Sequence, residues 1–180
     1  MKLATEDKAV KEFSNDYFDY GVHKVKMVVA NLDTTEEGKE YIEVTVCDTE
    51  TGEITDSARL WFVGGATNIS FNTVRQIIVH NAPEEDKDKA RDAVDKAADT
   101  EELVKLLNDH CVGGELWFTK YQDPTRTYMG KDSMPHKSIN KNVMGYEPKL
   151  KPELVPNRKS NDVVVTDLDS EPFGDTPDSE

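Results

Sequence analysis

GVHKVKMVVANL, residues 21–32, sets the pattern from which the fold is predicted. Val25, Met27 and Val29 stand at alternate positions, which is the period of two expected of a half-buried β-strand. Two more stretches with the same period follow after short turns, EYIEVTVCD (40–48) and ITDSARLWFVGG (54–65). Three such stretches joined by short turns predict an antiparallel meander.

Helical spacing replaces this alternation in the middle of the chain. NISFNTVRQIIVHNA (68–82) repeats its apolar residues at the spacing of one helical face. Pro83 suits the first turn of a second helix. Asp99, with Glu102 three residues later, is the N-cap pattern of a third helix. We therefore expect helices up to Gly113.

The period of two returns after the helices. ELWFTKY (115–121) predicts a fourth strand, and DPTRTYMGKDSMPHKS (123–138) predicts a hairpin with a long tip. SINKNVMGY (138–146) predicts the last strand. Three strands, helices and two further strands follow the order of the oligonucleotide-binding (OB) barrel. We therefore predict a mainly β, α+β fold: a five-stranded OB-like antiparallel barrel with helices between strands 3 and 4.

Composition divides the chain into three segments. We expect an N-terminal arm at 1–20, an OB-like nucleic-acid-binding domain at 21–148, and a Pro-rich linker with a disordered acidic tail at 149–180. The last twenty residues hold seven acidic residues and neither lysine nor arginine. Such a segment buries too little apolar surface to fold alone.

The bulk properties limit the class of protein. The chain has 180 residues, a length typical of one domain with an appendage. No apolar run approaches the roughly 20 residues of a membrane helix, and acidic residues stand where a signal peptide would be apolar. Cys47 and Cys111 are too few for a zinc site with four cysteines. We expect a soluble, cytoplasmic protein with reduced thiols.

Sequence motifs for catalysis are missing. The chain holds no HExxH, GxSxG, Walker or GxGxxG pattern. Close pairs of carboxylates occur, as in any acidic chain, and solvated surface acids account for them. We therefore expect no enzyme activity, no catalytic residue, no metal and no cofactor.

Charge is unevenly distributed. The net charge is −14, which taken alone disfavours nucleic acid because phosphates repel carboxylates. Residues 113–149, however, combine six lysines and arginines with four acidic residues, and aromatic residues lie among them. The distribution therefore matters more than the sum.

The polar faces of the predicted strands combine cations with aromatic rings. Such a face suits single-stranded nucleic acid, because cations follow the phosphates and rings stack on bases of any sequence. Ordinary amphipathic strands, and a solvated loop near the C-terminal end, remain alternatives. The candidate phosphate contacts are Lys24, Lys26, Arg59, Lys120, Arg126, Lys137 and Lys141, and the candidate stacking rings are Tyr41, Trp61, Trp117 and Tyr128.

The acidic tail carries an isolated apolar residue, Phe173. It has two predicted roles: competition with nucleic acid for the basic cleft, and presentation of Phe173 to a basic pocket on a partner protein. A merely solubilising tail is the alternative. The candidate partner-binding residues are Phe173, Asp167, Asp169, Glu171 and Asp175.

This combination resembles single-stranded DNA-binding proteins, particularly those that bacteriophages encode. The similar segments are GVHKVKMVVANL, EYIEVTVCD and ARLWFVGG, within roughly residues 20–148, followed by the linker and the tail. The resemblance implies an OB fold, sequence-tolerant binding of exposed strands, and a tail that recruits polymerase, nuclease or recombinase. Bacterial tails end on a Pro-Phe-like segment, whereas Phe173 here lies seven residues before the last residue.

We therefore expect a protein that coats and protects single-stranded DNA, without sequence specificity, in replication, recombination or repair. Its expected partners are single-stranded DNA and replication or recombination proteins, with no membrane, and a homo-oligomer is compatible with the sequence. Two other functions stay open. One is an acidic DNA mimic that inhibits a nuclease or restriction enzyme, and the other is an OB-like structural or assembly protein.

Overall fold

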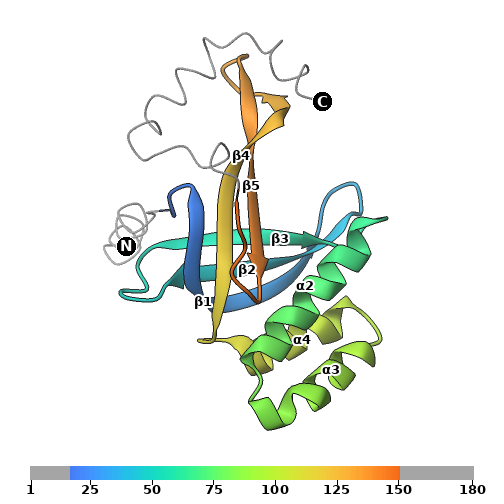
Figure 1. Ribbon diagram of the computed structural model, residues 1–180. Coiled ribbons are helices and arrows are strands. Elements are labelled where there is room, and N and C mark those ends of the chain that lie inside the picture. The colour runs from blue at the N-terminus through green and yellow to red at the C-terminus, as the bar shows by residue number, and fades with distance from the viewer. Residues whose placement is uncertain (1–16, 151–180) are drawn as a thin grey trace, which may run out of the picture.

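A computed structural model of the chain describes residues 17–150 (Figure 1). They form a five-stranded antiparallel sheet with helices inserted between its third and fourth strands, so the predicted α+β class and element order are confirmed. The strands are β1 Gly21–Thr34, β2 Glu40–Asp48, β3 Thr55–Trp61, β4 Glu115–Met129 and β5 Pro135–Met144.

The strand pairing confirms the predicted meander. The hydrogen-bonded order is β3-β2-β1-β4-β5, with β1 between β2 and β4. Met27 pairs with Val46 of β2, and Val25 pairs with Leu116 of β4. The register shifts between Met27 and Val29. Because of this bulge, Ala30 is the next fully buried residue of β1 and Val29 is only partly buried, unlike the unbroken alternation expected.

The sheet is open rather than a closed barrel. Within residues 17–150, no backbone pairing joins the edge strands β3 and β5. Backbone hydrogen bonds therefore do not close the predicted five-stranded barrel. The two edges instead meet through side chains, because the Lys141 ammonium on β5 lies 3.0 Å from the Asp56 carboxylate on β3. We call this junction the seam.

The helices cover one end of the sheet (Figure 1). Asp99 caps the last helix as predicted, because its Oδ1 accepts a hydrogen bond from the Glu102 amide at 3.0 Å. Gly113 then takes a φ of 78° and turns the chain into β4. The helices are α2 Ala66–Asn81, the 3₁₀ turn η1 Glu84–Asp86, α3 Lys87–Asp95 and α4 Thr100–Cys111.

One hydrophobic core joins the sheet to the helices. Ile42, Leu116 and Phe118 from the strands pack with Ile77 of α2 and Leu107 of α4, and all five are fully buried. Each contributes about 1.5–3 kcal/mol by leaving water. The core therefore fixes which face of each strand points outward, and with it the residues available for binding.

The last two strands extend beyond the body of the protein as a ribbon (Figure 1). The pairing of β4 with β1 ends at Lys120, whereas its pairing with β5 continues to Met129. Residues 123–138 form the predicted hairpin, but its strands pair as far as Met129 and Pro135, so the tip is shorter than expected. The turn itself is closed by the Gly130 amide, which donates to the Met134 carbonyl at 2.8 Å.

Candidate nucleic-acid interface

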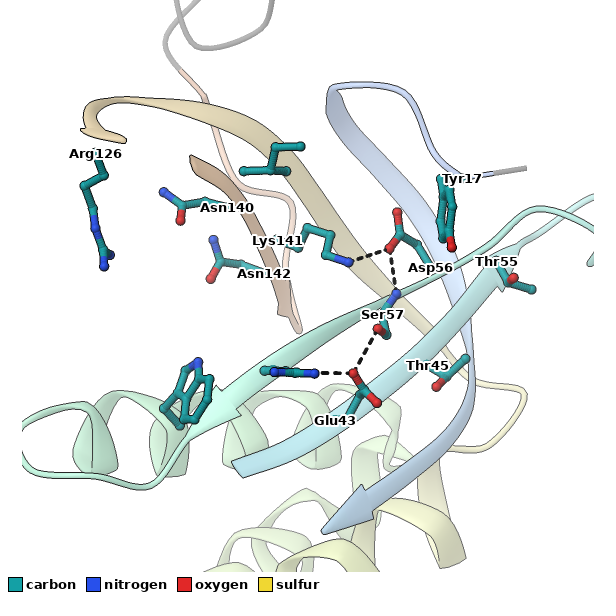
Figure 2. Close-up of a pocket in the computed structure, with 13 residues that line it drawn as sticks. Tyr17, Glu43, Thr45, Thr55, Asp56, Ser57, Arg126, Asn140, Lys141 and Asn142 are labelled. Atoms are coloured by element: carbon teal, nitrogen blue, oxygen red, sulfur yellow. Dashed lines mark hydrogen bonds and ion pairs between the residues drawn. The ribbon is translucent and has the colours of Figure 1, made fainter. Parts of the chain in front are cut away.

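A groove of about 710 Å³ crosses the outer face of the sheet between the β2–β3 pair and β5 (Figure 2). Polar and charged side chains dominate its lining. Side chains from β2 and β3 form one wall, β5 forms the other, and the ribbon contributes Arg126. The lining residues are Tyr17, Glu43, Thr45, Thr55, Asp56, Ser57, Arg59, Trp61, Arg126, Ile139, Asn140, Lys141 and Asn142.

Strand alternation places the β3 residues of the groove. Ala58 and Leu60 point into the core and are buried. Ser57, Arg59 and Trp61 therefore point outward, since successive side chains of a strand face opposite sides. The register with β2 sets Arg59 opposite Glu43.

Arg59, Tyr41 and Trp61 form one packed cluster beside the groove. The Arg59 guanidinium carbon lies 4.5 Å from the centre of the Tyr41 ring, a cation–π geometry. The Tyr41 and Trp61 rings lie 4.9 Å apart. Tyr41 itself is 6% exposed, and its hydroxyl donates to Asp33 at 3.2 Å. Tyr41 therefore supports Arg59 and Trp61, whereas these two line the groove.

The seam engages two of the predicted phosphate contacts. Asp56 has a side chain that is 1% exposed, and its carboxylate lies 3.0 Å from the Lys141 ammonium and 3.5 Å from that of Lys120. Lys120 also donates to the Phe18 carbonyl at 2.9 Å, and its side chain is 15% exposed. The Lys141 side chain is 35% exposed and lines the groove. The Lys141 side chain is thus partly accessible to a ligand in the groove, whereas the Lys120 side chain is mostly buried and already bonded to Asp56 and Phe18.

The ribbon carries the next group of predicted residues. Arg126 reaches the groove, and Lys137 lies opposite Thr127 in the register. Tyr128 is 53% exposed, with its ring 5.6 Å from that of His136. A hydrogen bond from His136 holds the pKa of the Asp132 carboxyl below its usual range. The ribbon thus brings Arg126 to the groove, whereas Lys137, paired with Thr127, faces the opposite side of the ribbon from Tyr128.

Three predicted residues lie outside the groove, on the β1–β4 pair. Lys24 lies opposite Trp117 in the register of β1 with β4, and Lys26 lies opposite Glu115. The Lys24 ammonium pairs with Glu115 at 3.5 Å. None of the three is among the residues that line the 710 Å³ groove. The structure therefore separates this set from Arg59 and Trp61.

The groove continues past Trp61 toward α2. A smaller hollow of about 270 Å³ shares Arg59, Trp61 and Asn142 with the groove. Its further side is lined by the start of α2, including the exposed Ile69. The lining residues of the two hollows together extend from the ribbon, across β5 and β3, to the helix.

Sequence reasoning missed the uncharged polar residues, the two acids and the isoleucine that line the groove. Glu43 shares the outward face of β2, so alternation alone would have placed it. Asn140 and Asn142 occupy alternate positions of β5, the same signal in a strand whose pattern is weak. The missed lining residues are Tyr17, Glu43, Thr45, Thr55, Asp56, Ser57, Ile139, Asn140 and Asn142.

Nothing in the described part of the chain has the arrangement of a metal centre. Among residues 17–150, no group of three or more histidines, cysteines and acids could hold an ion. Cys47 and Cys111 are free thiols, and burial raises the pKa of Cys111 to about 12. No helix in the same range is long and apolar enough to cross a membrane.

The candidate partner-binding residues of the tail lie outside the described residues, as does most of the N-terminal arm. The described residues of that arm, 17–20, form neither helix nor strand. The sequence matches no protein-family model and no curated protein. The groove is therefore the feature from which we infer a function.

Proposed function

We propose that this protein binds and coats single-stranded DNA in the groove, without catalysis, during replication, recombination or repair. The observation that carries the proposal is the groove of about 710 Å³, which brings together Arg59, Trp61, Arg126 and Lys141 from three separated segments. Cations and an aromatic ring along one open track are what a flexible strand requires.

Binding would combine base stacking with contacts to phosphates. Trp61 in the groove and Tyr128 on the ribbon would stack on bases, each worth about 1–3 kcal/mol. Arg59, Arg126, Lys137 and the exposed side of Lys141 would contact phosphates. Because every base has a flat face, binding of this kind tolerates sequence.

The strand order supports an OB-like architecture for this function. The helices lie between β3 and β4, and β1 pairs with both β2 and β4. OB folds are five-stranded and partly open, and they bind oligonucleotides on the face of strands 2 and 3 between two loops. We propose that the open sheet is such a variant, that the seam takes the place of backbone pairing, and that the protein belongs with the bacteriophage-type single-stranded DNA-binding proteins.

The tail belongs to the same proposal. Its carboxylates are tethered to the domain, so even a weak contact with the groove would compete with DNA through high effective concentration. A bound strand would then free Phe173 for a replication or recombination protein in the cytoplasm. Truncation after Lys159 removes seven acidic residues and should tighten DNA binding, most at low salt.

A DNA mimic is the second candidate, and the folded surface supports it. Residues 17–150 contain 16 lysines and arginines against 24 aspartates and glutamates, a net charge of −8. Residues 84–109, in the helical layer, hold ten of these acids and five of the bases. Acids on a folded surface are what a mimic of phosphates needs.

A titration separates the two candidates. The full chain and the chain truncated after Lys159 are titrated with oligo(dT) of about 15 nucleotides, and tryptophan emission and the anisotropy of labelled DNA are followed. We expect quenching, and tighter binding by the truncated chain. If neither chain binds while the protein inhibits a nuclease that acts on DNA, the mimic is favoured and the binding proposal fails.

A further inference from the structure

An ionisable acid stands in the middle of the proposed DNA track. Glu43 lines the groove, and its carboxylate lies beside Ser57 (Figure 2). Oε2 accepts from the Ser57 hydroxyl at 3.2 Å and from Arg59 Nε at 3.4 Å. Both contacts use Oε2, which leaves Oε1 for a donor on a ligand.

The contact between Glu43 and Arg59 is weak enough for a ligand to replace. Its distance is 3.4 Å and the two side chains are 35% and 49% exposed. Exposed ion pairs of this kind contribute about 0–1 kcal/mol. A ligand that offers better hydrogen bonds to the carboxylate can therefore displace this contact at little cost.

The charge of Glu43 also orients a bound strand. A phosphate beside this carboxylate would be repelled, whereas Arg126 and Lys141 are cations on the other side of the groove. Most phosphates of a bound strand would therefore follow β5 and the ribbon, and its base edges would face Glu43. Once a base replaces the contact between Glu43 and Arg59, the Arg59 guanidinium would be free to contact one further phosphate. In a single strand the base edges are unpaired and free for hydrogen bonding.

The four bases differ in what they offer to a carboxylate, which only accepts hydrogen bonds when ionised. Adenine and cytosine each place one amine beside a ring nitrogen that is itself an acceptor. Thymine places its single N–H between two carbonyl oxygens. Guanine alone presents two adjacent donors, N1–H and the 2-amino group, which match the two oxygens of a carboxylate.

We infer that Glu43 gives the groove a preference for guanine within a strand that is otherwise bound with little regard to sequence. This inference rests on the proposed function and specifies which base the groove prefers. Charge-assisted hydrogen bonds are about twice as strong as neutral ones. The preference therefore adds to stacking and phosphate contacts, which remain the main source of affinity.

Hypoxanthine provides the matched probe, because it keeps N1–H and lacks only the 2-amino group. The full chain is titrated with labelled strands of about 15 nucleotides, a length within the range of OB site sizes. One strand repeats thymine, thymine and guanine, the second carries hypoxanthine in place of guanine, and the third is oligo(dT). We expect the guanine strand to bind on the order of ten-fold tighter than the hypoxanthine strand.

Two variants identify the carboxylate. Glu43→Gln should bring the ratio between guanine and hypoxanthine strands close to one, because an amide offers one acceptor and one donor. Glu50→Gln removes the same charge from an exposed turn outside the groove and should keep the ratio. The ratio of affinities for the guanine and hypoxanthine strands is also measured with the unmodified chain. That comparison therefore tests the preference even if Glu43→Gln fails to fold.

The outcomes separate the two proposals. If oligo(dT) binds and the guanine and hypoxanthine strands bind equally, the preference is overturned and the binding function stands. A preference that survives in folded Glu43→Gln overturns the role of this residue. If none of the three strands binds, the proposed function fails, and the preference fails with it.

Discussion

Arg59 with Trp61 and Lys24 with Trp117 offer the same pairing of a cation and an indole, but the two pairs lie in different surroundings. Arg59 and Trp61 line the groove of about 710 Å³, whereas Lys24 and Trp117 lie opposite one another on the β1–β4 pair, outside it. Arg59 is also supported by the Tyr41 ring, at 4.5 Å. Residue type alone therefore does not distinguish a binding face from an ordinary outer face.

The difference comes from the position of each pair in the sheet. β3 is an edge strand of the sheet, and β5, the opposite edge, lies across the groove from it. Lys24 and Trp117 lie on two adjacent hydrogen-bonded strands, so no gap between sheet edges lies between them. A groove therefore lies where backbone pairing does not close the sheet, and the seam joins the two edges there.

The largest expected effect comes from breaking the seam. Asp56→Ala leaves Lys120 and Lys141 without their shared partner in a largely buried site, which should cost about 3 kcal/mol of unfolding free energy. Urea unfolding followed by circular dichroism measures this loss. Asp109→Asn, at an exposed position of α4, is the control for the loss of one acid and should change stability by less than about 0.5 kcal/mol.

The stability of Asp56→Ala also tests whether the seam holds β3 and β5 together beside the groove. If Asp56→Ala is as stable as the unmodified chain, the junction between β3 and β5 depends on other contacts. The seam would then not explain why Arg59 and Trp61 lie in a groove while Lys24 and Trp117 do not.

The next effect compares the two tryptophans directly. Trp61→Ala should weaken oligo(dT) binding by about 1–3 kcal/mol, because it removes a stacking ring from the groove. Trp117→Ala should change binding by less than about 0.5 kcal/mol. Anisotropy of labelled DNA measures both, with circular dichroism to confirm folding. Equal losses in the two variants would extend the interface to the β1–β4 face.

The third effect concerns salt. Each phosphate contact releases about 0.7 ions on binding a single strand, so log K falls with log[salt] in proportion to the number of contacts. Arg59→Gln and Arg126→Gln should each flatten the slope by about 0.7. Lys24→Gln, on the other face, should leave the slope as it is. A slope that responds to Lys24 and not to Arg126 would move the phosphate path to β1.

The fold could be predicted largely from local patterns. Alternation placed the strands, and Asp99 with Glu102 located the start of α4, because both signals act between near neighbours in sequence. The bulge after Met27 and the opening between β3 and β5 could not be predicted, since they depend on pairing between distant strands. The long pairing of the ribbon was missed for a similar reason, because Pro124 and the polar residues around it resemble a loop.

The candidate site could be predicted only in part. Alternation separates outward from inward residues, and it identified Arg59 and Trp61 correctly as outward. It gave no sign that Lys120 would meet Asp56, 64 positions away, inside the seam. Which outward residues share a groove is set by the curvature of the sheet, and a one-dimensional pattern does not contain that information.

The smallest effect concerns the turn that joins β2 and β3, the two strands that form one wall of the groove. Asp48 accepts hydrogen bonds from the Thr51 amide at 2.7 Å and the Ile54 amide at 3.0 Å. These bonds, chiefly those from Thr51, lower the pKa of the Asp48 carboxyl from 3.8 to about 2. Folding therefore favours the ionised form of this side chain.

The sign of the pH dependence follows from that shift. The stabilisation from Asp48 is fully present above the unfolded pKa of 3.8 and is lost as the pH falls toward the folded value of about 2. Asp48→Asn should unfold at a lower urea concentration near neutral pH, and its disadvantage should shrink as the pH falls through this window. Urea unfolding at a series of pH values measures it, with Glu53→Gln, in the same exposed turn, as the charge control. A disadvantage that stays constant down to pH 2 would show that the carboxylate charge does not hold the turn, and that packing alone positions the β2–β3 wall.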